Sequence, residues 1–186
     1  CGTTMDGKAF IFKVGKFDNS LTFFRKFSIE SEGVEIFDIG DYYYYFANTP
    51  ISLNNDDGDY LMLQLDKSSG DIAAGSTPLG FVSTANEKIA AVATDGTHFY
   101  IATNFTSLPP DVADYIGVLK MNLTGGISWT RRASGEDLQL VDIQYKDDDI
   151  YFLGKNVPNV LDSTAVIYKL SSNGFSETDH SYYPMG

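Results

Sequence analysis

The sequence predicts an all-β fold made of repeated four-stranded antiparallel units, and three observations lead to that prediction. The 186 residues include 12 Tyr and 13 Phe but one Trp, a composition rich in strand-forming residues. Short apolar segments end in clusters of Gly, Asp, Asn and Ser, which favour tight turns. Related segments recur at a regular spacing, and no helical periodicity of useful length lies between them.

The first recurring segment is a strand that opens with Asp, carries Lys or Gln near its end, and closes in turn-forming residues. It occurs at 6–20, 59–70, 114–126 and 162–174. The opening Asp residues are 59−6 = 53, 114−59 = 55 and 162−114 = 48 positions apart. This spacing indicates an internal repeat.

The second recurring segment is a hairpin, found at 34–48, 89–104 and 140–156. Its bends contain Gly and Asp, which tolerate positive φ, and its closing Asn residues are 104−48 = 56 and 156−104 = 52 positions apart. One further strand fits between the two families, at 21–29, 71–79 and 127–133. The repeat therefore has four strands, denoted a, b, c and d in chain order from the Asp-led strand.

Four antiparallel strands repeated at this spacing without helices are typical of a β-propeller blade. The segment 114–154 resembles the SBBP or beta-propeller repeats of extracellular proteins. The matching residues are Asp114, Lys120, Gly126, Trp129, Gly135 to Asp137, Tyr151 and Gly154. The first two repeats lack the Trp and the fourth stops early, so the resemblance weakens over the rest of the chain. It implies a propeller fold, and that fold alone names no activity.

We expect one continuous propeller domain with three complete blades and partial blades at both ends. Residues 1–5 would end a preceding blade, 6–48, 59–104 and 114–156 would form blades 1 to 3, and 162–186 would start blade 4. Since propellers usually have about four to eight blades, we expect a fragment of a larger ring, and a four-bladed ring closed by pairing both ends is the alternative. Open blade edges are then expected to associate with other strands.

Charge and hydropathy limit the classes of partner that the chain is expected to bind. The formal net charge of −12 disfavours nucleic acid, and no apolar run approaches the roughly 18 residues that span a membrane. Cys1 fits either the end of an upstream strand or the lipidated start of a bacterial lipoprotein. Two sequons, at Asn104 and Asn122, are candidate glycosylation sites and favour an extracellular or cell-surface location.

The longer loops, b to c and d to a, fall on one face of the predicted blades, and we expect binding there because loops on a rigid scaffold carry function. This face collects the candidate binding residues Asp56, Asp57, Asp59, Asp111, Asp114 and Asp162, with Asp6 at an equivalent position. Coordination of Ca²⁺ by these carboxylates is one interpretation, although Leu53 occupies the first position of a calcium-loop pattern. The favoured interpretation is that each Asp accepts hydrogen bonds from backbone amides that enter strand a, so no cofactor is expected.

Catalytic and metal motifs do not stand out. His98 and His180 lack metal-ligand spacing, and the run Tyr42 to Tyr45 fits the core of a packed strand better than a binding patch. We therefore expect a non-catalytic binding or scaffold domain that engages a protein or glycan through the long-loop face. The alternative is a glycan-active hydrolase whose paired carboxylates come from Asp57, Asp59, Asp111, Asp114 and Glu136.

Overall fold

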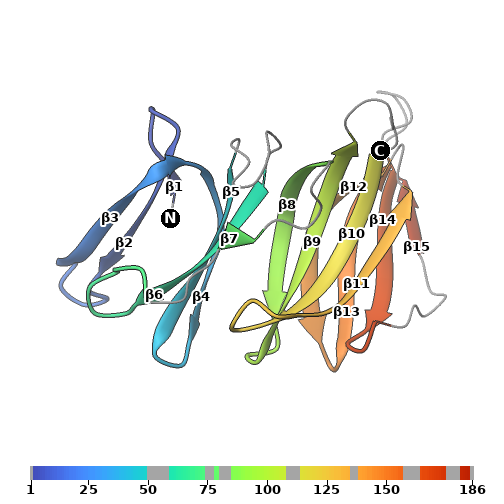
Figure 1. The fold of residues 1–186 in the computed structure, drawn as a ribbon. Coiled ribbons are helices and arrows are strands. Elements are labelled where there is room, and N and C mark those ends of the chain that lie inside the picture. Colours follow the sequence, from blue (N-terminus) through green and yellow to red (C-terminus); the bar gives the residue numbers. More distant parts are fainter. Residues whose placement is uncertain are drawn as a thin grey trace. The chain divides into compact units, whose positions relative to one another are not determined.

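The computed structural model describes residues 2–49, 59–73, 78–79, 85–107, 114–134, 138–156, 164–174 and 181–184, and it is all-β over these ranges. The chain divides into two compact units, Cys1–Ser83 and Thr84–Gly186, and each holds two antiparallel sheets (Figure 1). In these ranges, no helix is long and apolar enough to cross a membrane.

Every sheet is built from strands that are consecutive in the chain. Sheet I contains β1 (Gly2–Thr3), β2 (Lys8–Val14) and β3 (Leu21–Glu30). Sheet II contains β4 (Glu32–Ile39), β5 (Tyr42–Thr49), β6 (Asp59–Asp66) and β7 (Pro78–Leu79). Sheet III contains β8 (Ala85–Thr94), β9 (His98–Ser107), β10 (Asp114–Asn122) and β11 (Ile127–Ser134). Sheet IV contains β12 (Leu138–Lys146), β13 (Asp149–Asn156), β14 (Thr164–Ser171) and β15 (Ser181–Pro184).

The four-stranded repeat is present, but the sheets begin at a different strand from the one the sequence suggested. The predicted blade 6–48 is divided between two sheets, with β2 and β3 in sheet I and β4 and β5 in sheet II. The predicted blades 59–104 and 114–156 are divided in the same way. Likewise, 162–186 completes sheet IV, and β1 pairs with β2 inside sheet I. Ser31 is the one residue between β3 and β4, which is too short for a hairpin turn, so the chain must pass to the next sheet there. Sheets II to IV therefore run in the order c, d, a, b, and sheet I contains strands d, a and b among the described residues.

A β-bulge recurs in strand c of sheets II, III and IV. The register shifts lie between Gly33 and Glu35, between Ile89 and Ala91, and between Leu140 and Asp142. Because the extra residue resets the alternation, Leu140 and Ile143 both face the core although they are three positions apart.

The core of the first unit lies between sheets I and II. Ala9 and Ile11 of β2 and Phe23 of β3 pack against Tyr45 and Leu65 of sheet II, together with Ala47 and Leu63. The expectation that the Tyr42 to Tyr45 run belongs to the core is confirmed for Tyr44 and Tyr45, which are buried. Tyr45 also stacks on Phe27, with ring centroids 5.1 Å apart.

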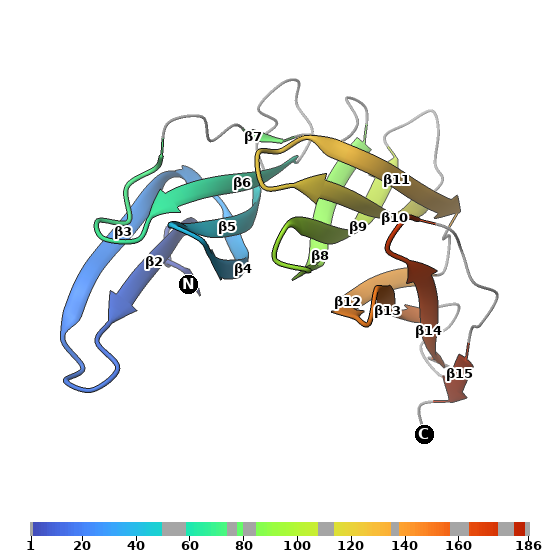
Figure 2. The same cartoon turned by 90° about the horizontal axis from the view of Figure 1, so that it is seen from below.

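The core of the second unit lies between sheets III and IV, whose two layers are visible in Figure 2. Tyr100, Ala102 and Val118 face Ile143 and Ile150, and Tyr100 stacks on Tyr145 with ring centroids 5.3 Å apart. Strand a of the leading sheet and strands d and a of the following sheet contribute buried residues to the core in both units.

A set of contacts that we name the turn clamp joins the two sheets of the second unit. Lys120 of β10 donates from Nζ to the Ser172 carbonyl at 3.2 Å, in the turn that follows β14. The Trp129 indole donates to the same carbonyl at 3.1 Å, and Arg131 Nε donates to the Gly174 carbonyl at 2.5 Å. Gly174 has φ of +85°, and a Cβ there would lie 2.9 Å from Cδ2 of Trp129.

The first unit has the same clamp two repeats earlier. Lys13 of β2 donates to the Lys67 carbonyl at 3.1 Å, in the turn that follows β6. Phe23 covers Gly70, where a Cβ would lie 2.7 Å from the ring, and Arg25 forms an ion pair with Asp71 at 2.9 Å. The offsets to the second clamp are 120−13 = 107, 129−23 = 106 and 131−25 = 106. Each clamp therefore holds one sheet against the sheet that follows it.

Candidate functional site

Most of the carboxylates predicted for the long-loop face lie outside the described residues, namely Asp56, Asp57, Asp111, Glu136 and Asp162. Asp59 and Asp114 begin strand a of their sheets, where the backbone pairs with Thr49 and Thr106 respectively, and their side chains are not described. Both thus occupy the strand end that the repeat predicted for them. Whether they bind a partner stays a prediction.

The described aspartates hold turns or surface pairs. Asp6 forms an ion pair with Lys26 at 2.7 Å and accepts a hydrogen bond from Thr4, and these partners lower the pKa of its carboxyl to about 2. Asp66 accepts hydrogen bonds from the Ser68 hydroxyl and from the backbone of Ser69 and Ser68, which lower its pKa to about 2. Carboxylates held in this way stay ionised at neutral pH and are poor general acids.

Asp95, in the turn between β8 and β9, accepts four hydrogen bonds on its carboxylate, as Asp66 does. Burial opposes its charge, but the Thr97 hydroxyl and amide, the Tyr100 hydroxyl at 2.8 Å and the His98 amide at 2.6 Å together lower its pKa. His98 Nδ1 lies 3.4 Å from the second carboxylate oxygen. His180 is outside the described residues, and the described ones contain no group of three or more His, Cys, Asp or Glu arranged for a metal ion.

The two sequon asparagines have clear structural contacts. Asn104 of β9 reaches sheet IV, where its Nδ2 donates to the Leu140 carbonyl at 2.9 Å and its Oδ1 accepts from the Leu140 amide at 2.8 Å. A register shift of β12 against β13 directly follows Leu140. Asn122 accepts from the amides of Thr124 and Gly126 in the turn after β10. The contacts of Asn104 point to a role in joining sheets, and glycan attachment to its Nδ2 would remove one of the two bonds.

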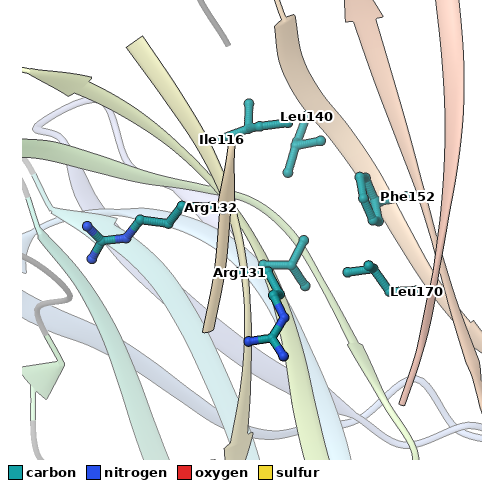
Figure 3. Close-up of a pocket in the computed structure, with 8 residues that line it drawn as sticks. Ile116, Arg131, Arg132, Leu140, Phe152 and Leu170 are labelled. Atoms are coloured by element: carbon teal, nitrogen blue, oxygen red, sulfur yellow. The ribbon is translucent and has the colours of Figure 1, made fainter. Parts of the chain in front are cut away.

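A pocket of about 260 Å³ lies between sheets III and IV, and it is the candidate binding site of the second unit (Figure 3). Its lining is mostly apolar and comes from five strands: Ile116, Gly117, Val118, Arg131, Arg132, Leu140, Phe152 and Leu170. Position 117 of this lining needs glycine, because a Cβ there would lie 2.5 Å from the Phe105 ring.

The two arginines of the pocket differ in orientation, as Figure 3 shows. The Arg132 guanidinium lies 5.5 Å from the centroid of Phe105, whereas Arg131 lies 5.7 Å from the centroid of Trp129 and belongs to the turn clamp. Arg131 Nη1 donates to the Thr130 carbonyl at 2.9 Å and Nε to Gly174, which leaves Nη2 outside these two bonds. Apolar side chains beside the Arg131 guanidinium make the pocket suited to bind an apolar group that carries an anionic oxygen.

Sequence reasoning did not single out Arg131, Asn104 as a link, or the pocket. The available signal was the aromatic-x-Arg pattern at Phe23 and Arg25, which recurs at Trp129 and Arg131 two periods later. No protein-family model matches the chain, and no curated protein matches it, so the resemblance to SBBP repeats rests on the residues quoted above.

Proposed function

We propose that the chain is a non-catalytic binding or scaffold domain of β-propeller type, from an extracellular or cell-surface protein. The observation that carries this proposal is the turn clamp, which recurs with the same three side-chain positions in both units. A clamp that fixes the two sheets of a unit against each other suits a rigid platform for loops, which is how propellers present binding surfaces.

The partner is a protein or glycan that engages the long-loop end of the strands, where Asp59 and Asp114 begin strand a. The pocket between sheets III and IV provides an anchor for an apolar side chain that lies close to a carboxylate, because Arg131 is one of its lining residues and most of the others are apolar. Its volume is near the lower end of ligand sites, which typically occupy roughly 300–1,000 Å³, so it fits one side chain better than a whole cofactor.

The pocket part of the proposal is tested with short peptides that end in Leu or Phe, each prepared with a free or an amidated carboxyl terminus. We expect chemical-shift changes at the amides of Ile116, Leu140 and Phe152 with the free carboxylate, and at least about a tenfold weaker response with the amide. Arg131→Gln should weaken binding by a similar factor. Arg25→Gln removes the equivalent clamp arginine of the first unit, which does not line this pocket, so it is the matched control and should leave binding unchanged.

The non-catalytic part is tested with a panel of polysaccharides and chromogenic glycosides. We expect no turnover by the wild-type chain, and binding of one class of glycan or of a surface protein that weakens in Asp59→Asn or Asp114→Asn. Turnover that either substitution abolishes would instead establish the hydrolase alternative, since paired carboxylates are the chemistry that such enzymes need.

A further inference from the structure

Sheet I exposes an aromatic face on the side turned away from sheet II. Phe12 and Phe24 are directly paired across β2 and β3, and they are 49% and 48% exposed. Phe10 stacks on both, with ring centroids 6.2 Å from Phe12 and 5.8 Å from Phe24. Val14 and Leu21, another directly paired set, are also exposed. We name this set of five residues the head face.

Sheet IV exposes an aliphatic face on the side turned away from sheet III. Leu153 and Ile167 are directly paired across β13 and β14, and they are 36% and 37% exposed. Val141, the bulge residue of β12, is exposed as well. We name these three residues the tail face. Single exposed apolar residues are ordinary, but paired residues on one sheet face form a patch.

The repeat shows what the head face is equivalent to. Phe12 precedes the clamp residue Lys13 by one position, as Leu63 precedes Gln64 and Tyr168 precedes Lys169. Leu63 is buried in the core cluster formed with sheet I, and Tyr168 packs on the core cluster formed with sheet III. The head face is therefore the side by which sheets II and IV each pack on the preceding sheet.

The tail face is equivalent to the opposite side of the same interface. Ile167 lies two positions before Lys169, as Ile11 lies two before Lys13 and Val118 two before Lys120. Ile11 and Val118 are buried against the following sheet. The cross-strand pairing agrees, since Leu153 pairs with Ile167 as Ala102 pairs with Val118.

The head face and the tail face are thus the two sides of an interface that the chain forms once inside each unit, and both faces are exposed. We propose that a second copy of the chain covers them, with the tail face of one copy packed on the head face of the next. Such an interface is heterologous, because the two copies contribute different surfaces, and it goes beyond the binding function proposed above. Asn19 replaces the clamp glycine in the turn of sheet I, so we expect the contact between copies to be weaker than the internal ones.

The test uses sedimentation velocity and light scattering on the chain as it stands, over roughly 1 to 500 µM, the range in which interfaces of modest affinity dissociate. We expect the wild-type mass to rise with concentration. Phe12→Lys blocks the head face and Ile167→Lys blocks the tail face, and each should weaken self-association at least about tenfold because a charge would be buried without a partner. Ile127→Lys is the matched control, since Ile127 is 50% exposed on β11 and belongs to neither face.

Mixing the two blocked variants separates a heterologous interface from a symmetric one. Together they retain one intact head and one intact tail, so an equimolar mixture should form a heterodimer and stop there. A chain carrying both substitutions should stay monomeric in every mixture. Circular dichroism confirms that each variant is folded. A monomeric wild type at all concentrations, self-association of either single variant at the wild-type level, or a mixture that stays monomeric would each overturn the proposal.

Discussion

Replacing Gly174 by Ala tests whether the turn clamp holds sheets III and IV together. The added Cβ would lie 2.9 Å from Cδ2 and 3.1 Å from Cε2 of Trp129, and 3.3 Å from Nη2 of Arg131. The φ of +85° adds backbone strain of about 1–2 kcal/mol for any residue with a Cβ. Crowding the indole adds about 1–3 kcal/mol, since Trp129 is tied to Ser172 and cannot move freely.

Gly96→Ala is the matched control. Gly96 has a nearly identical φ of +87°, and a Cβ there would meet nothing within 4 Å. Both substitutions reduce the freedom of the unfolded chain equally, so their difference isolates the clamp. We expect Gly174→Ala to lower the free energy of unfolding by about 1–3 kcal/mol more than Gly96→Ala does.

The assay is equilibrium urea unfolding followed by far-ultraviolet circular dichroism and by tryptophan fluorescence. Trp129 is the sole Trp, so its emission reports the clamp directly. Its native emission should shift in Gly174→Ala and stay unchanged in Gly96→Ala. Equal destabilisation by the two substitutions, with unchanged emission in both, would refute the clamp as a source of stability.

Three further predictions concern polar groups that are buried or half-buried. Tyr45→Phe should raise the free energy of unfolding by about 1 kcal/mol in a urea titration, because the buried Tyr45 hydroxyl has no hydrogen-bond partner among the described residues; a loss of stability would contradict this. Asp95→Asn should lower the free energy of unfolding by about 2 kcal/mol at pH 7. Because the pKa of Asp95 in the folded protein lies below the unfolded value of 3.8, this loss should shrink as the pH falls below about 4. A loss that does not depend on pH would show that the charge of Asp95 is irrelevant. Asn104→Ala should cost about 1–3 kcal/mol and speed hydrogen exchange at the Leu140 amide, which would keep its protection if the link were unimportant.

The strands and their period could be predicted from the sequence, because turn residues and apolar segments are local signals. The assignment of strands to sheets could not be predicted in the same way. The sequence of a hairpin and of the strand that follows it does not show whether that strand pairs in the same sheet or belongs to the next sheet. The one-residue link at Ser31 was the informative signal, and it depends on knowing where β3 ends and β4 begins.

Contacts between sheets were harder still to predict, because they join residues about one repeat apart. Inside a sheet, the closing Asn of each hairpin shows a change of register that a regular spacing hides. Asn48 pairs with Tyr60, and Asn104 pairs with Ile116. The residue of sheet IV that corresponds to Tyr60 and Ile116 is Ala165, and its partner is Lys155. The closing Asn156 therefore lies one position away from the place that Asn48 and Asn104 occupy. A spacing read from the sequence cannot detect such a shift, whereas the hydrogen-bonded register does.

The consecutive strand order also bears on how such a chain can change its length. Each sheet forms from neighbouring strands, and the clamp reaches only the following sheet: Lys13 and Lys67 are 54 positions apart, and Lys120 and Ser172 are 52. Stability in such an architecture is a sum of terms for single sheets and for adjacent pairs. Duplication or deletion of one c-d-a-b segment then adds or removes one sheet without disturbing the strand pairing inside any other sheet. The number of sheets becomes a quantity that recombination can alter one step at a time.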